Sequence, residues 1–168
     1  HSEIVPGHIH LDKIAEAVGV GAIVFYYLSN NRIRDINFMI EDALSFEGNT
    51  GPYVQYTYAR TCSVLSKSGE YNKTAPLVIS ADEEISLLKT LSRFEEVVRE
   101  AIAVYEPSVI TRYILDVAGA YNRFYHNCSI LGAESEDVKN TRLALTEATK
   151  TVLGNAFDLI CLAKTEKI

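Results

Sequence analysis

An apolar stripe that follows Pro107 constrains the fold of this chain more than any other feature. Its members recur at steps of three and four residues: Ile110, Tyr113, Ile114, Val117, Ala118, Tyr121, Phe124, Tyr125 and Cys128. This spacing places them on one face of an α-helix, whereas a half-buried strand would alternate every second residue. A stripe this regular indicates a core helix, so we expect Tyr113, Phe124 and Tyr125 to be buried.

Other segments show the same helical spacing or the residues that begin and end helices. We expect helices over residues 11–28, 38–46 and 52–67, one that begins at Ala81 and continues to Ile102, and one that begins near Asp137 and passes through Gly154. Ser80 and Glu83 have the spacing of a capping box. The short apolar run 77–79 has no partner strand. The sequence therefore predicts an all-α bundle of about five to six helices.

Composition bounds the possible functions. With 168 residues and 48% apolar content, the chain can bury one main core. Its net charge is −6, whereas a free-standing RNA-binding domain usually has a basic surplus. Two interpretations therefore remain open: a local, stacking-dominated RNA contact, or no RNA contact. No apolar run is long enough to cross a bilayer, so we expect no membrane partner.

Three widely spaced cysteines and a few carboxylate pairs offer no catalytic constellation. Cys62, Cys128 and Cys161 form no Cys-x-x-Cys pair, so we expect buried thiols in a reducing, cytoplasmic setting and no metal site. The pairs Glu83–Glu84 and Glu95–Glu96 are interpreted as solvated helix faces. We expect no catalytic residue and no cofactor site in this chain.

The segment from Leu44 to Arg60 combines a tight polar loop with the start of a helix. Gly48 and Gly51 favour backbone angles closed to other residues. Beyond them, Tyr53, Tyr56 and Arg60 share one helix face. Two tyrosines and an arginine can stack on unpaired bases and hold a phosphate. The alternative is that the tyrosines are half-buried core residues and the arginine a solvated charge.

Several segments resemble, in the right order, the carboxyl-terminal part of arginyl-tRNA synthetases. They are Val20–Phe25, Phe38–Leu65, Glu106–Pro107, Tyr113–Ala118, Asn122–Tyr125, Arg142–Leu145 and the ending Glu166–Ile168. The resemblance implies a helical segment at residues 1–47 that adjoins a catalytic domain, followed by an anticodon-binding bundle at 48–168. It implies tRNA-Arg, rather than DNA, as the nucleic acid partner. Carried over by position, the RNA contacts fall on Asn49, Tyr53, Tyr56, Arg60 and Ile168.

The same resemblance implies that the catalytic chemistry lies elsewhere in the parent enzyme. ATP and Mg²⁺ would be bound by the catalytic domain, whose lysine-bearing signature is absent here, so we expect this chain to be inactive alone. The family usually ends in methionine, and Ile168 is less flexible and less polarisable. A second hypothesis stays open, in which the chain is a helical protein–protein interaction bundle without an RNA role.

Overall fold

The computed structural model describes residues 6–168, with side chains from Leu11 onward. Within this range the chain forms seven helices and no strand. They are α1 (Pro6–Leu28), α2 (Ile40–Ala43), α3 (Gly51–Ser68), α4 (Asp82–Ser92), α5 (Phe94–Val104), α6 (Ser108–Asn127) and α7 (Glu136–Leu159). Six helices remain when α2, which is a single turn, is set aside. The predicted all-α bundle of about five to six helices is therefore confirmed. No helix in the described part of the chain is both long and apolar enough to span a bilayer.

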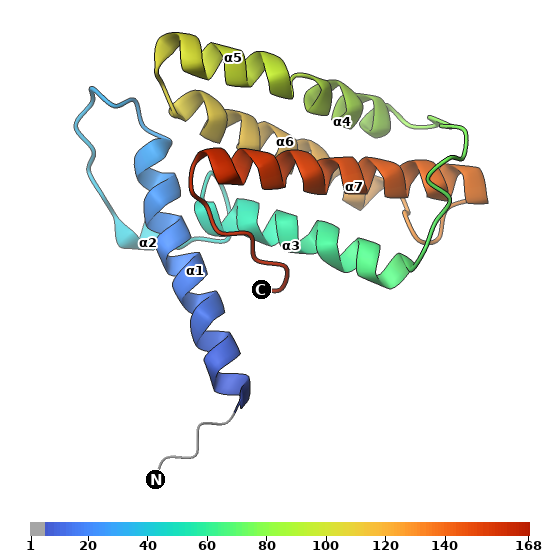
Figure 1. Ribbon diagram of the computed structural model, residues 1–168, viewed down its shortest axis with the longest axis horizontal. Helices are drawn as coiled ribbons and strands as arrows, with labels where there is room; N and C mark the ends of the chain where they lie inside the picture. The colour runs from blue at the N-terminus through green and yellow to red at the C-terminus, as the bar shows by residue number, and fades with distance from the viewer. Residues whose placement is uncertain (1–5) are drawn as a thin grey trace.

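Three long helices form the centre of the bundle. Figure 1 shows α7 running antiparallel to α3 and α6, with α4 and α5 end to end along α6 and α1 crossing near the start of α3. The interior between them is filled by fully buried apolar side chains from five of the helices: Phe25, Val54, Leu87, Ile114, Val117, Tyr121, Phe124, Leu143, Leu153 and Phe157. The stripe on α6 therefore supplies the largest part of the core, as its spacing predicts.

Local hydrogen bonds fix the ends of α3 and α7. The Thr50 hydroxyl accepts a hydrogen bond from the backbone N–H of Tyr53 at 3.2 Å, and Ser135 accepts one from Val138 at 3.3 Å. Such caps satisfy amides that have no partner in the first turn. At the far end of α7, Leu162 N–H donates to the Phe157 carbonyl across a left-handed Cys161, which is a Schellman arrangement.

The predicted continuous helix from Ala81 to Ile102 is wrong, because it breaks at Arg93 into α4 and α5. The reason is a tertiary contact. The Tyr113 hydroxyl, from α6, lies 3.1 Å from the Thr90 carbonyl oxygen and 3.2 Å from that of Leu91. It satisfies carbonyls that a continuing helix would have occupied, and this allows the chain to turn.

The two loop glycines have different roles. Gly48 has a φ of 81°, as its predicted left-handed geometry requires. Gly51 is instead the first residue of α3 and has no positive φ, so that expectation is wrong. Its side-chain position is blocked by α1, since a Cβ atom there would lie 2.6 Å from the Gly21 carbonyl oxygen. Gly51 is therefore needed for close helix packing.

Glu84 was expected on a solvated face, and the structure contradicts this. Its side chain is 0% exposed, and its carboxylate accepts a hydrogen bond from Arg142 Nε at 2.7 Å. The carboxylate also accepts the backbone N–H groups of Ser80 and Ala81. Glu84, rather than Glu83, thus closes the N-terminus of α4, one residue later than the predicted capping box.

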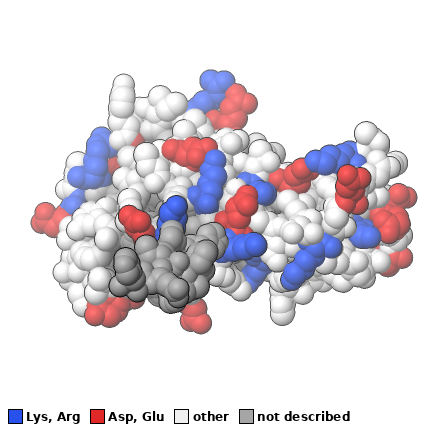
Figure 2. Space-filling view, turned by 60° about the horizontal axis from the view of Figure 1, so that its bottom comes forward, with Lys and Arg blue, Asp and Glu red and all other residues white. Residues whose placement is uncertain are grey.

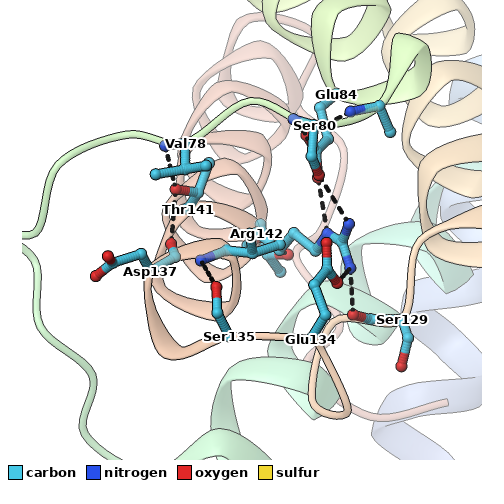
Figure 3. A network of polar contacts seen from close by, with 12 residues as sticks. Val78, Ser80, Glu84, Ser129, Glu134, Ser135, Asp137, Thr141 and Arg142 are labelled. Carbon is cyan, nitrogen blue, oxygen red and sulfur yellow. Dashed lines mark hydrogen bonds and ion pairs between the residues drawn. The ribbon is translucent and has the colours of Figure 1, made fainter.

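Arg142 extends this contact into the network of Figure 3. Its side chain, 7% exposed, also donates to the Ser129 carbonyl at 2.9 Å and approaches the Glu134 carboxylate at 3.3 Å. Nearby, Thr141 Oγ1 accepts from Val78 N–H at 2.9 Å. The segment before α4 and the loop after α6 are therefore both held to the first turns of α7.

Removing one partner of this buried pair should be costly. Arg142→Met leaves the Glu84 carboxylate buried without its counter-charge, so we expect a loss of about 3–5 kcal/mol in the free energy of unfolding. The control is Arg99→Met, which removes an exposed pair with Glu95 and should cost less than about 1 kcal/mol. Urea unfolding measures both, and equal effects would contradict the network.

The same pair predicts a pH dependence. Burial raises the pKa of Glu84, but the hydrogen bonds from Arg142, Ser80 and Ala81 outweigh it and hold that pKa below its usual value. The folded state is therefore stabilised above the unfolded pKa of about 4.3, and this contribution is lost as the pH falls through the lower folded value. The stability gap between the parent and Glu84→Gln should shrink as urea unfolding is repeated from pH 7 towards pH 3. A gap independent of pH would show that Glu84 is not ionised in the fold.

Candidate nucleic-acid interface

A groove of about 1050 Å³ lies between α3, the end of α6 with the loop that follows it, and the carboxyl-terminal segment. Residues from all three parts line it: Tyr56, Ala59, Arg60, Cys62, Ser63, Val64, Ser66, Lys67, Tyr125, His126, Cys128, Ser129, Ile130, Leu131, Gly132, Glu166, Lys167 and Ile168. Its lining combines aromatic rings, cationic side chains and small polar groups. Such a mixture suits a ligand that has both flat apolar surface and negative charge.

The centre of the groove wall is an arginine between two tyrosines. The Arg60 guanidinium carbon lies 4.9 Å from the ring centroid of Tyr56 and 4.9 Å from that of Tyr125. Both tyrosines are 43% exposed. A cation held over aromatic faces is favourable in itself, so the three side chains form a preassembled stack that remains open to solvent.

Asn122, on α6, holds this stack in place through hydrogen bonds. Its Oδ1 accepts a hydrogen bond from Arg60 Nη1, and its Nδ2 donates to Tyr53 Oη at 2.9 Å and to Thr57 Oγ1 at 3.1 Å. One amide therefore links Arg60 to Tyr53 across the α3–α6 contact. Because Arg60 is held on a polar anchor and two rings, little of its side-chain freedom remains to be lost on binding.

The structure brings together three of the five residues named from the resemblance. Tyr56, Arg60 and Ile168 line the groove, and Ile168 is exposed there. Tyr53 is half-buried and does not line the groove, and its hydroxyl accepts a hydrogen bond from Asn122, which in turn accepts one from Arg60. Asn49 is exposed in the loop before α3 and does not line the groove.

Sequence reasoning missed several groove residues. Tyr125 was expected in the core together with Tyr113 and Phe124, which are indeed buried, but its ring lies on the groove instead. Consecutive helix residues point about 100° apart, so Tyr125 falls at the edge of the stripe that Phe124 centres. That angular position was the available signal. No comparable sequence pattern marked His126, Lys67 or Lys167 as groove residues.

Few charged side chains line the groove in the described part of the chain. Arg60, Lys67 and Lys167 line it, with Glu166 as the one acidic lining residue in the described part of the chain. The Oε1 atom of Glu166 lies 3.6 Å from the Nζ atom of Lys150. On the face shown in Figure 2, Lys and Arg side chains are interspersed with acidic ones rather than gathered into one continuous basic surface.

The thiols show no sign of a shared site. Cys128 is buried as expected, and burial raises the pKa of its thiol. Cys62 is half-buried and Cys161 is exposed, so the expectation of three buried cysteines is wrong for these two. Among the described residues, no cluster of histidine, cysteine, aspartate and glutamate side chains could hold a metal ion.

Comparisons with known proteins bear directly on this groove. The model of the DALR anticodon binding domain family matches residues 54–168, which include every residue that lines it. The chain belongs to this family.

Relatives and solved structures extend the likeness to the amino-terminal helix. The chain is 45% identical over 158 residues to an arginine–tRNA ligase of Clostridium botulinum, and 46% identical over 159 residues to one of Clostridium acetobutylicum. These matches cover 94% of this chain but 28% of each relative. Arginyl-tRNA synthetase of Thermus thermophilus matches with a TM-score of 0.87 and 35% identity, over 92% of this chain and 27% of that one. The Plasmodium falciparum enzyme matches with a TM-score of 0.85 and 25% identity, over 96% and 29%.

Alanine variants of two neighbouring aromatic residues should distinguish a core side chain from a side chain on the groove. Phe124→Ala leaves a cavity in the core and should lower the free energy of unfolding by about 3–5 kcal/mol. Tyr125→Ala, one residue further along α6, should cost about 1 kcal/mol because the ring is partly in solvent. Urea unfolding of both variants tests the assignment, which a Tyr125→Ala loss equal to that of Phe124→Ala would overturn.

Proposed function

We propose that this chain is the anticodon-binding part of an arginine–tRNA ligase and that its groove holds unpaired nucleotides of tRNA-Arg. The observation that carries the proposal is the Tyr56–Arg60–Tyr125 stack on the wall of the groove. Exposed aromatic rings can stack on splayed-out bases irrespective of base identity, and an adjacent arginine can contact the phosphate between two such bases. The groove offers both within one stretch of wall.

This assignment is compatible with the acidic balance of the chain. Stacking on tyrosine draws on the π-face of the base and needs no wide positive field. The cations that line the groove supply a few phosphate contacts where the bases would lie. Further phosphate contacts belong, in this proposal, to the remainder of the parent enzyme, since the chain spans only 28% of the length of its relatives.

The proposal places the chemistry of aminoacylation outside this chain. Arginine activation, ATP and Mg²⁺ are assigned to the parent's catalytic domain, and the chain alone is expected to be inactive. Residues 1–47 adjoin that domain, the bundle at 48–168 binds RNA, and the enzyme acts in the cytoplasm. Two further residues are retained as proposed RNA contacts beside the groove: Asn49, in the loop before α3, and Tyr53, whose hydroxyl accepts a hydrogen bond from Asn122.

A second candidate function, protein interaction, draws on a different surface. Val20, Ile23 and Tyr27 are exposed apolar residues that share one face of α1. Isolated apolar residues are normal on protein surfaces, but several on one helix suit contact with another protein surface. We assign this face to the parent's own catalytic domain, so the two functions use separate parts of the chain.

Affinity for tRNA is the direct test. The chain should bind a tRNA-Arg transcript more tightly than an unrelated tRNA. Tyr56→Ala should weaken that binding by about 1–3 kcal/mol through lost stacking, and Tyr56→Phe should retain most of it. Arg60→Gln should also reduce the slope of log affinity against log salt by about one ion.

The matched control is Tyr105→Asn. Tyr105 is a more exposed tyrosine at the end of α5, away from the groove, and asparagine tolerates its left-handed backbone. This variant should bind like the parent. Equal affinity of Tyr56→Ala and the parent for tRNA-Arg, with both folded by circular dichroism, would refute the proposed site.

A further inference from the structure

Gln55 is a fully buried polar side chain at the meeting point of three segments. It is 0% exposed, and its Nε2 donates to the Ala163 carbonyl at 3.0 Å and to the Ala17 carbonyl at 3.2 Å. Only this orientation of the amide sets a donor against two carbonyl oxygens. One side chain on α3 thus links α1 to the segment that follows α7.

The Gln55 amide packs closely against Gly21 of α1. A Cβ atom on Gly21 would lie 2.8 Å from the Gln55 side-chain nitrogen and oxygen and 2.9 Å from Leu162 Cδ1. Real Cβ atoms do not approach other heavy atoms this closely. Gly21 therefore permits α1, α3 and the carboxyl-terminal segment to reach their observed separation.

From Ala163 the carboxyl-terminal segment continues directly to the groove. The carboxyl-terminal segment turns back from α7 and crosses α3 in Figure 1, and Glu166, Lys167 and Ile168 line the groove a few residues beyond Ala163. Beyond the backbone hydrogen bonds that close the end of α7, this segment also forms the ion pairs Lys164–Asp158 and Lys150–Glu166, whose carboxylates are largely exposed. Exposed pairs contribute little, whereas the Gln55 hydrogen bond is buried.

We infer that Gln55 is a positioning residue for RNA binding, which it supports by anchoring the backbone of the carboxyl-terminal segment. It does not line the groove and acts through residues 166–168, which do. This inference rests on the proposed function of the groove. Without the Gln55 anchor the segment keeps its covalent attachment to α7 but loses its fixed place along α3, and one wall of the groove becomes mobile.

A double-mutant cycle tests the inference. Gln55→Met keeps the approximate size of the side chain but cannot donate to either carbonyl. In the full chain it should weaken binding of a tRNA-Arg transcript roughly 3- to 10-fold, the loss expected for a buried hydrogen bond. In a chain that ends at Thr165 it should cause no further loss. Equal losses in both backgrounds, or no loss in either, would overturn the positioning role.

A second comparison uses two glycines on the same helix. Gly21→Ala would displace the Gln55 amide and Leu162, whereas a Cβ at Gly19 meets nothing within 4 Å. Both changes raise helix propensity alike. Gly21→Ala should therefore reproduce the binding loss of Gln55→Met, and Gly19→Ala should bind like the parent.

Backbone ¹⁵N relaxation separates this inference from the proposed function, because it requires no RNA. In Gln55→Met the order parameters of Thr165–Ile168 should fall below those of the parent, while those around Leu153 in α7 should stay unchanged. Unchanged order parameters at the carboxyl terminus would refute the anchor even if tRNA binds. Lower order parameters in a chain that binds no tRNA-Arg would leave the anchor standing and refute the RNA site.

Discussion

The buried pair of Arg142 and Glu84 is the interaction on which the arrangement of this bundle depends most. A charge removed from water must be compensated within the fold, and here each partner satisfies further groups. Glu84 caps α4, and Arg142 reaches the Ser129 carbonyl in the loop after α6. That loop is one wall of the groove. A contact in the interior of the bundle therefore determines the shape of the surface that we assign to RNA.

Much of the fold could be predicted from the sequence, because apolar spacing reports directly on helix faces. The stripe on α6 and the passage of α7 through Gly154 both follow from local chemistry. The break at Arg93 could not be predicted, since it depends on a hydroxyl from Tyr113 that lies about twenty residues away. For the same reason Glu84 was misassigned: its partner is distant in sequence and nothing nearby marks it as buried.

The candidate site was predictable in part. Tyr56 and Arg60 share a helix face by spacing alone, and the resemblance to arginyl-tRNA synthetases added Ile168. Tyr125 escaped because a ring at the edge of an apolar stripe is compatible with either the core or the surface. The distinction between Tyr53 and Tyr56 also required coordinates, because it depends on which of the two rings Asn122 ties to the bundle. In each case the missing information is the position of a second helix.

Chemical-shift mapping of the backbone amides with an isolated anticodon stem-loop of tRNA-Arg is the most direct test of the central claim. The account predicts that the largest changes fall on residues 56–67, 125–132 and 166–168, which form the three walls of the groove. A stem-loop with the anticodon bases replaced should reduce them. Changes centred instead on α5 or on the exposed apolar residues of α1, with the groove amides unmoved, would contradict the assignment of this groove to RNA.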